Sequence, residues 1–301
     1  MHIEGVYVPF ATPFHANGDL DLDRLPLIIE HILGAGCHGL VAAGTTGEYY
    51  ALTHDERLAV FQRAIDINAG RAVMVAGCNA GGTREVVDFA QAAKDMGYDA
   101  IMLAAPATSL PRQHELAAHF MTVADECGLP VILYNYPARA GVEIGFDCLD
   151  ALADHPGIVA IKESSSDFSR FIAMRRRYAG RLDIMCGSDD QAADYFAWGV
   201  RSWLAGTGNV LPAHHVAIMN AANAGDVPAA RAAFDAILPW VQHMEEGQYN
   251  QKVKLGLLMQ GIDLGPVRAP ILALRPEDEA VTRGFVTEAL AAPMAAVPSN
   301  A

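Results

Sequence analysis

The stretch IVAIKESSS, residues 158–166, decides the fold class of this chain. Its first four residues are all apolar, without the alternation of a half-buried strand, which is typical of a strand buried on both faces in a parallel sheet. Lys162 ends this apolar run, and a small polar segment follows it. Because lysine is almost never fully buried without a partner or a function, Lys162 is the first candidate functional residue.

The chemistry open to Lys162 depends on its surroundings. Burial of a lysine disfavours the charged ammonium and lowers the pKa, and the neutral amine is a nucleophile toward carbonyl groups. The alternative is a structural lysine that extends past the end of the strand to solvent or pairs with an acid. The chain has only three other lysines, Lys94, Lys252 and Lys254, and we expect all three on helix surfaces.

Seven further strand-like runs accompany this stretch along the chain. Between the runs lie segments with apolar residues at helical spacing, such as Leu25, Ile28 and Ile32. Eight strand-and-helix units over about 220 residues predict an α/β protein with a (β/α)8 TIM barrel. An open doubly wound sheet is disfavoured because no Gly-rich dinucleotide fingerprint follows the first strand. The predicted strands are residues 5–9, 39–43, 72–77, 100–105, 131–136, 158–162, 183–187 and 202–206.

The last quarter of the chain lacks strand-like runs. After Pro212 the pattern is helical only, and it predicts helices at residues 229–244, 251–260 and 277–290, followed by a loose tail at 293–301. We therefore divide the chain into a barrel, residues 1–224, and a C-terminal helical appendage packed on the barrel, residues 225–301. Within the barrel, Thr53, Thr83 and Asp167 each stand before a helical segment, which predicts that they are N-caps.

The composition excludes several classes of function. The chain has 301 residues, is 52% hydrophobic and carries a formal net charge of −14. Nucleic acids and anionic membranes are recognised by basic patches, so we expect neither as a partner. The N-terminus lacks a basic start followed by an apolar core, and no apolar run approaches about 18 residues, so we expect a cytoplasmic protein.

Cysteine and histidine give no sign of a metal site. The five cysteines are scattered along the chain, which indicates buried free thiols in a reducing compartment. The eleven histidines show no metal-ligand spacing, and the adjacent pair His214 and His215 would point about 100° apart on a helix. We therefore expect neither a metal nor a cofactor.

Polar segments follow several predicted strands at the carboxyl end of the barrel, which is where barrels of this kind hold their active sites. The turn GTTGE, residues 44–48, offers free backbone N–H groups that can bind a carboxylate or phosphate, and the hydroxyls of Thr45 and Thr46 can carry protons. The turn alone could equally be an ordinary link between a strand and a helix. The segment GSDD, residues 187–190, could position hydroxyl groups of a substrate or cap the next helix.

The segment LYNYPARAG, residues 133–141, adds two candidates. Tyr134 is predicted to point into the barrel mouth one strand away from Lys162. Arg139, in the loop above, could bind a carboxylate through two hydrogen bonds, or it could be a surface arginine.

Together these groups predict Schiff-base chemistry on a 2-keto acid. Lys162 supplies the nucleophile, Tyr134 and Thr46 transfer protons, the turn at residues 44–48 holds one acid, and Arg139 holds a second. An iminium withdraws electrons, so a carbanion can form beside it and attack, or be released from, an aldehyde or imine.

These motifs resemble those of the dihydrodipicolinate synthase / N-acetylneuraminate lyase family of class I aldolases. The resemblance covers nearly the whole chain, and it implies an enzyme that acts on pyruvate or a related 2-keto acid and assembles as a homotetramer. The matching motifs, in the order and spacing of the family, are VPFATPF at 8–14, GTTGE at 44–48, YNYP at 134–137, IKE at 161–163, KVK at 252–254 and RAP at 268–270.

The resemblance also implies roles for single residues. Lys162 is implied to be the Schiff-base lysine and Tyr134 the phenol that moves protons to it. Thr45 and Thr46 are implied to hold the pyruvate carboxylate and relay a proton. Arg139 matches the arginine that binds the carboxylate of aspartate semialdehyde in the synthases. The remaining residues that we expect to bind substrate are Gly44, Thr108, Gly187, Ser188 and Leu204.

One segment departs from the pattern of the synthases. They carry two adjacent tyrosines between two prolines after the fourth strand, and the second tyrosine reaches the site of a neighbouring subunit. Here the segment is PATSLP, residues 106–111, and Thr108 stands at the position of that tyrosine.

Two functions therefore stay open for this chain. One is a condensation of the kind that the synthases catalyse. The other is an aldolase, dehydratase or deaminase reaction on a 2-keto acid derived from a sugar or from hydroxyproline. A keto-acid sensor without catalysis and a metal-dependent class II aldolase are less favoured alternatives.

Overall fold

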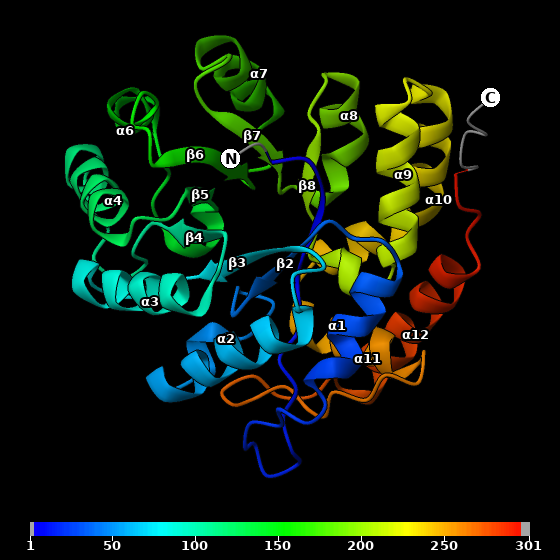
Figure 1. The fold of residues 1–301 in the computed structure, drawn as a ribbon. Coiled ribbons are helices and arrows are strands. Elements are labelled where there is room, and N and C mark those ends of the chain that lie inside the picture. Colours follow the sequence, from blue (N-terminus) through cyan, green and yellow to red (C-terminus); the bar gives the residue numbers. More distant parts are fainter. Residues whose placement is uncertain (1–2, 296–301) are drawn as a thin grey trace.

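Eight parallel strands close into a barrel, in which each strand pairs with the next along the chain and the last pairs with the first. The computed structural model describes residues 3–295 (Figure 1). This architecture confirms the predicted (β/α)8 barrel, and each predicted strand is correct to within two residues. The strands are β1 (Gly5–Pro9), β2 (Gly39–Ala42), β3 (Val73–Gly77), β4 (Ala100–Ala104), β5 (Val131–Asn135), β6 (Ile158–Glu163), β7 (Asp183–Cys186) and β8 (Ser202–Leu204).

Helices follow the strands and cover the outside of the barrel (Figure 1). In α1 (Leu25–Gly34), the buried residues Leu25, Ile28 and Ile32 recur at helical spacing and form one apolar stripe. The other helices around the barrel are α2 (His54–Asn68), α3 (Thr83–Met96), α4 (Gln113–Cys127), α5 (Pro137–Ala140), α6 (Phe146–Leu152), α7 (Phe168–Arg177), α8 (Ala192–Ala197) and α9 (Pro212–Asn223).

Two of the three predicted N-caps are confirmed. Thr53 and Glu56 form a capping box at the start of α2, in which the Thr53 hydroxyl accepts from the Glu56 amide at 3.3 Å. Asp167 caps α7 through its side chain. The prediction for Thr83 is wrong, because α3 begins with Thr83 itself. The Thr83 hydroxyl instead lies 2.8 Å from Nδ1 of His119 on the neighbouring helix α4.

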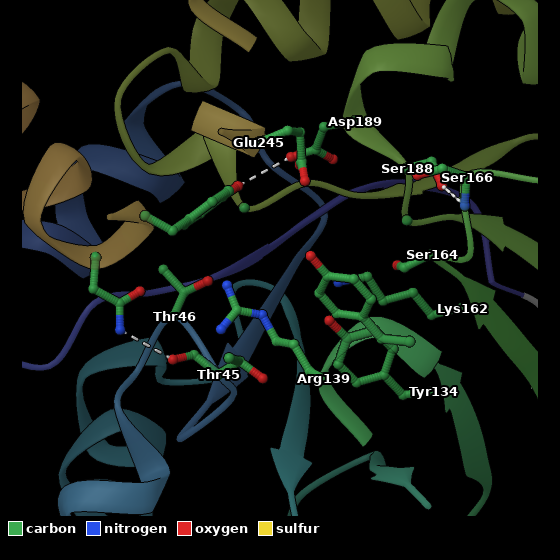
Figure 2. Close-up of a pocket in the computed structure, with 15 residues that line it drawn as sticks. Thr45, Thr46, Tyr134, Arg139, Lys162, Ser164, Ser166, Ser188, Asp189 and Glu245 are labelled. Atoms are coloured by element: carbon green, nitrogen blue, oxygen red, sulfur yellow. Dashed lines mark hydrogen bonds between the residues drawn. The ribbon is translucent and has the colours of Figure 1, made fainter. Parts of the chain in front are cut away.

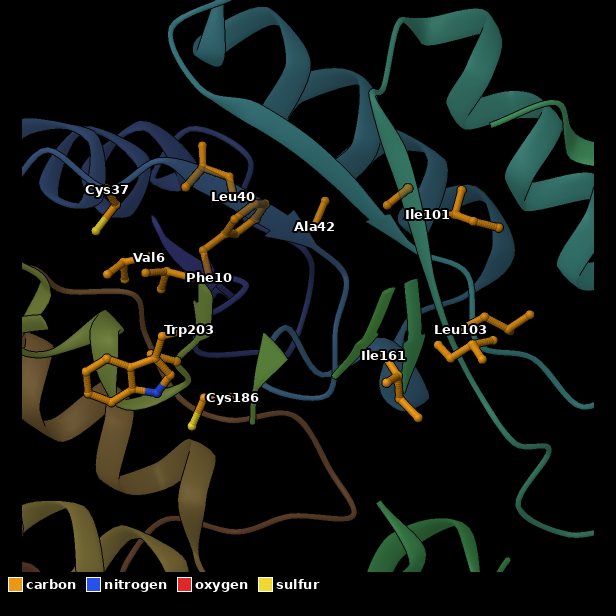
Figure 3. Close-up of a cluster of buried hydrophobic side chains, with 14 of the residues drawn as sticks. Val6, Phe10, Cys37, Leu40, Ala42, Ile101, Leu103, Ile161, Cys186 and Trp203 are labelled. Atoms are coloured by element: carbon orange, nitrogen blue, oxygen red, sulfur yellow. The ribbon is translucent and has the colours of Figure 1, made fainter. Parts of the chain in front are cut away.

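The core of the barrel has two layers. The outer layer lies between the strands and the helices and includes Val6, Leu40, Ile161 and Trp203 (Figure 3). The inner layer fills the axis of the barrel, and it explains why β6 is apolar without alternation, since both of its faces are buried. The residues of the inner layer are Ile3, Tyr7, Val41, Val75, Ala100, Met102, Ile132, Tyr134, Ala160, Met185 and Leu204.

Three helices follow the barrel and form the C-terminal appendage, α10 (Val227–Glu245), α11 (Tyr249–Leu258) and α12 (Pro276–Leu290). They confirm the three predicted helices. Helix α10 packs against α8 and α9, and α12 packs against α10 and α11 (Figure 1). Residues 296–301 of the predicted tail lie outside the described residues.

The lysines of the appendage contradict the prediction of helix-surface positions. Lys252 and Lys254 are only 3% and 6% exposed. The ammonium of Lys252 donates a hydrogen bond to the carbonyl of His243, and that of Lys254 lies 2.9 Å from Oε1 of Glu48. The prediction failed because α11 packs against α10 and α12 as well as the barrel, so its polar residues are enclosed. Lys94 on α3 is exposed, as predicted.

The five cysteines are all buried and unpaired, as predicted. Across residues 3–295, no group of three or more histidine, cysteine or acidic residues is arranged to hold a metal ion. In the same part of the chain, every helix is too short or too polar to cross a lipid bilayer.

Candidate active site

A pocket opens at the carboxyl end of the barrel, and Lys162 of β6 faces it (Figure 2). The space inside is small, about 50 Å³, which is enough for a few water molecules or the few heavy atoms of a small acid. The residues that line the pocket are Thr45, Thr46, Tyr134, Tyr136, Arg139, Lys162, Ser164, Ser166, Gly187, Ser188, Asp189, Gly206, Glu245, Tyr249 and Asn250.

Lys162 is 7% exposed, and no hydrogen bond or ion pair within the described residues engages its ammonium. The neighbouring carboxylate of Glu163 points away from the pocket and pairs with Arg170 at 3.2 Å. Burial lowers the pKa of Lys162, and the more distant acids Asp189 and Glu245 oppose that shift only in part. This environment favours the neutral, nucleophilic amine.

Tyr134 is the direct neighbour of Lys162 on β5, because the two residues are paired in the strand register. The Lys162 amine lies 4.3 Å from the centre of the Tyr134 ring. Burial raises the pKa of the Tyr134 phenol well above its usual range, and the charge of Arg139 offsets only part of that shift. The phenol therefore keeps its proton at neutral pH and can donate a hydrogen bond or pass a proton along a relay.

The turn that carries Thr45 and Thr46 is held in a restricted shape. Ala43 and Glu48 flank the turn, and both have positive φ angles, of 46° and 56°, which residues with side chains rarely adopt. Such conformations persist only where the surroundings enforce them. The hydroxyl of Thr12 contributes by donating to the carbonyl of Gly47 at 2.7 Å.

The C-terminal appendage fixes the same turn from outside the barrel. Lys254 contacts Glu48 as a close ion pair, although the geometry at Oε1 is not that of an aligned hydrogen bond. The other carboxylate oxygen of Glu48 accepts from the amide of Arg268 at 2.9 Å. Asn250 donates from Nδ2 to the carbonyl of Thr45 at 3.2 Å. The shape of the turn in the barrel thus depends on residues more than 200 positions later in the chain.

Gly187 lies directly under the side chain of Lys162. A β-carbon at Gly187 would stand 2.6 Å from Cγ of Lys162 and 2.2 Å from Oγ of Ser164. Both distances are far below van der Waals contact, so only glycine leaves room for the lysine at this position. The adjacent Ser188 lines the pocket and accepts from the amide of Ser166 at 3.2 Å.

Asp189, which follows β7 in the barrel, holds the appendage against one side of the pocket. Its buried carboxylate accepts from Nε1 of Trp203 at 2.8 Å and from the amide of Thr207 at 3.1 Å. It also accepts from the phenol of Tyr249 at 3.2 Å, and this bond holds the start of α11 against the barrel mouth. A side chain at Gly206 would collide with that phenol, since a β-carbon there would lie 2.2 Å from the Tyr249 oxygen.

Seven of the predicted site residues line the pocket, namely Thr45, Thr46, Tyr134, Arg139, Lys162, Gly187 and Ser188. Three others are not among its lining residues. Gly44 is buried in the turn beside Pro9, and Leu204 is buried in the inner layer of the barrel. Thr108 is exposed in the loop after β4.

Several lining residues were not predicted. Tyr136 has a signal in the sequence, because it follows Tyr134 at an interval of two within the predicted strand 131–136, the spacing that places side chains on one face of a strand. Ser164 and Ser166 belong to the polar segment that follows Lys162. Glu245, Tyr249 and Asn250 have no such signal, since only the packing of the appendage brings them to the barrel mouth.

A buried lysine without an ionic partner, facing a small pocket in a (β/α)8 barrel, places the protein in the class of lysine-dependent, class I lyases. Known relatives show to which family within this class the chain belongs. The sequence pattern of the Dihydrodipicolinate synthetase family matches residues 2–289, and the chain belongs to that family.

Individual relatives match along almost their whole length. A 4-hydroxy-tetrahydrodipicolinate synthase from an Exiguobacterium species is 34% identical over 276 residues, which are 92% of this chain and 94% of that protein. The crystal structure of dihydrodipicolinate synthase from Aquifex aeolicus has a TM-score of 0.92 and 30% identity, and covers 97% of this chain and 99% of its own. The chloride-inhibited enzyme from Acinetobacter baumannii, complexed with pyruvate, has the same TM-score and identity over 96% of this chain and 99% of its own.

Proposed function

We propose that Lys162 forms a Schiff base with pyruvate or a closely related 2-keto acid, and that the chain works as a lyase or synthase through this intermediate. The observation that carries the proposal is the burial of Lys162 in the pocket without an ionic partner. The pyruvate in the related Acinetobacter structure supports the choice of keto acid.

The lining residues support a sequence of steps. The neutral amine of Lys162 attacks the keto carbon of the substrate, and water leaves as the imine forms. Tyr134 and Thr46 transfer the protons that this dehydration requires. Loss of a proton from the carbon next to the imine gives an enamine, which attacks an aldehyde carbon to form a carbon–carbon bond. The reverse sequence cleaves such a bond. Hydrolysis of the imine then frees Lys162.

Arg139 supports a substrate with a second acidic group. It lies at the rim of the pocket, where its guanidinium stacks 5.4 Å from the centre of the Tyr136 ring. In the part of the chain that the structure describes, no carboxylate pairs with Arg139. A guanidinium held in this way offers parallel hydrogen bonds to the carboxylate of a ligand.

The reaction that the relatives favour is the condensation after which they are named, that of a 4-hydroxy-tetrahydrodipicolinate synthase. Pyruvate would be the first substrate and aspartate semialdehyde the second.

One observation favours the second candidate, an aldolase, dehydratase or deaminase of a hydroxylated 2-keto acid. The loop after β4 carries Thr108, exposed and outside the pocket lining, where the synthases carry a tyrosine. Without that phenol we expect the rate with aspartate semialdehyde to be about 10²–10⁴-fold lower. Steady-state kinetics on wild type and Thr108→Tyr distinguish the two. A wild-type kcat/KM of about 10⁴ M⁻¹s⁻¹ or more with aspartate semialdehyde would favour the synthase reaction.

Reductive trapping tests the Schiff base itself. Pyruvate with borohydride should add the mass of the reduced adduct to the peptide that contains Lys162, and Lys162→Ala should take up no label. Lys94→Ala, which removes an exposed lysine, is the matched control and should be labelled like wild type. Labelling at Lys94, or catalysis without any labelling, would overturn the mechanism.

We also propose that the protein is a cytoplasmic homotetramer built from a barrel, residues 1–224, and an appendage, residues 225–301. The five unpaired cysteines support a reducing compartment. The family resemblance supports the tetramer, and the apolar composition of the chain, 52% hydrophobic, suits extensive subunit interfaces. Light scattering at micromolar concentration should give four times the chain mass of 32.1 kDa, and a monomer mass would refute the assembly.

A further inference from the structure

Glu245 brings an unpaired carboxyl group into the pocket. It is the last residue of α10 and lines the pocket together with Lys162, Arg139 and Asp189 (Figure 2). No hydrogen bond or ion pair within residues 3–295 engages its carboxyl group. Its neighbour in the sequence, Glu246, points elsewhere and lies 3.0 Å from Nδ1 of His243.

The surroundings of Glu245 are unusual for a carboxylate at the mouth of a pocket. Burial together with the charges of Asp189 and Asp190 raises the pKa of Glu245 to about 7, and the charges of Lys162 and Arg139 oppose the shift. The side chain of Glu245 is also exposed to solvent. The electrostatic environment of Glu245 is therefore set by two acids at the end of β7, Asp189 and Asp190, and by Lys162 and Arg139 of the reactive centre.

Asp189 and Glu245 differ in how their oxygens are satisfied. Asp189 is buried and accepts hydrogen bonds from Trp203, Thr207 and Tyr249, so its acceptor positions are used within the protein. Glu245 receives no such bond from the described residues. When a substrate enters and displaces water from the pocket, an unsatisfied carboxylate needs a donor from that substrate.

We propose that Glu245 is a specificity-determining residue that binds an O–H or N–H donor on the second substrate, while Arg139 binds its carboxylate. This inference rests on the proposed Schiff-base function. It names the class of second substrate as a short aldehyde acid, or the matching part of a longer keto acid, that bears a hydroxyl or amino group besides its carboxylate. An analogue without that group leaves the carboxyl group of Glu245 unpaired, and we expect it to bind about tenfold more weakly or worse.

The test measures binding to the trapped enzyme, so that it does not depend on turnover. Wild type, Glu245→Gln and Glu246→Gln are first reduced with borohydride in the presence of pyruvate, and mass spectrometry confirms the adduct on Lys162. Calorimetry then gives the Kd of each adduct for three aldehydes of equal chain length. These are aspartate semialdehyde with its amino group, the analogue with a hydroxyl in its place, and succinate semialdehyde with neither.

We expect wild type and Glu246→Gln to bind at least one donor-bearing aldehyde about tenfold or more tightly than succinate semialdehyde. If the donor is an amine, the ratio of the two Kd values should fall to within about twofold of one in Glu245→Gln, since the neutral amide of glutamine does not balance the charge of the ammonium group. A hydroxyl donor should keep part of its preference, because the amide oxygen still accepts a hydrogen bond. The preferred aldehyde thus distinguishes the two kinds of donor.

Two results would overturn the inference while leaving the Schiff base intact. One is a normal adduct on Lys162 with no preference for either donor in wild type. The other is a preference that Glu245→Gln and Glu246→Gln retain equally. Failure to form the adduct in wild type would instead overturn the proposed function, and the inference with it. A Glu245→Gln variant that traps pyruvate at the wild-type rate shows that the substitution has not disturbed the fold of the site.

Discussion

The pocket has two sides of different origin. The strand side carries Tyr134, Lys162 and Gly187 at the ends of β5, β6 and β7, and the appendage side carries Glu245 and Tyr249 from α10 and α11. The register of the barrel fixes the strand side, whereas helix packing and a few polar contacts fix the appendage side. We infer from this difference that the strand side carries out the reaction and that the appendage side selects the second substrate. Changes on the strand side should then lower kcat, and changes on the appendage side should raise KM.

Lys254→Met removes the ion pair through which the appendage holds the turn at residues 44–48 of the barrel. Of the three substitutions, it should have the largest effect on free energy. It removes the charge that pairs with the buried Glu48, and a buried charge without its partner typically costs about 3–5 kcal/mol of stability. Urea titration followed by circular dichroism, at one fixed protein concentration, measures the free energy of unfolding. Lys94→Met is the control on an exposed lysine and should change it by less than about 0.5 kcal/mol. A loss below about 1 kcal/mol for Lys254→Met would show that the two sides are held independently.

Gly187→Ala tests the strand side alone. The added methyl group would overlap the stem of Lys162, so the amine must move, and a displacement of about 1 Å lowers kcat by about 10²-fold, or about 2.7 kcal/mol. Steady-state kinetics should show this fall with a KM for the second substrate within about twofold of wild type. Gly34→Ala adds the same methyl group where no atom lies within 4 Å, and should leave kcat unchanged. An unchanged kcat for Gly187→Ala would show that Lys162 tolerates displacement.

Tyr249→Phe tests the appendage side and should have the smallest effect. It removes the phenol that donates to Asp189, a contribution of about 1 kcal/mol, which corresponds to a rise of about fivefold in the KM of the second substrate. We expect kcat and the rate of pyruvate trapping to stay at wild-type values. Tyr98→Phe removes a phenol that donates to the carbonyl of Phe61, away from the pocket, and should leave KM unchanged. A fall in kcat for Tyr249→Phe would contradict the division between the two sides.

The strand side could be predicted from the sequence because its signals are local. The apolar run before Lys162 predicts a strand buried on both faces, and the same pattern predicts Tyr134 on the neighbouring strand. The capping box of Thr53 and Glu56 likewise depends only on residues three positions apart. Such features are correct because neighbouring residues determine them.

The appendage side could not be predicted in this way. Lys252 and Lys254 have the polar neighbours of surface residues, and only packing between α11 and the other elements buries them. Glu245 ends a helix in the manner of many exposed acids, and the sequence does not show that α10 stops at the barrel mouth. These positions depend on contacts between segments that lie far apart in the chain.

The filled axis of the barrel has a consequence for the order of events. Tyr7, Met102, Met185 and other side chains of the inner layer occupy the interior, so the pocket is closed at its base. Lys162 is buried while Glu245 and Arg139 lie nearer to solvent. In the proposed reaction the keto acid must therefore bind before the aldehyde, and an aldehyde that binds too early at the mouth of the pocket blocks the way to Lys162. Such an enzyme should show inhibition by excess aldehyde that rising pyruvate relieves.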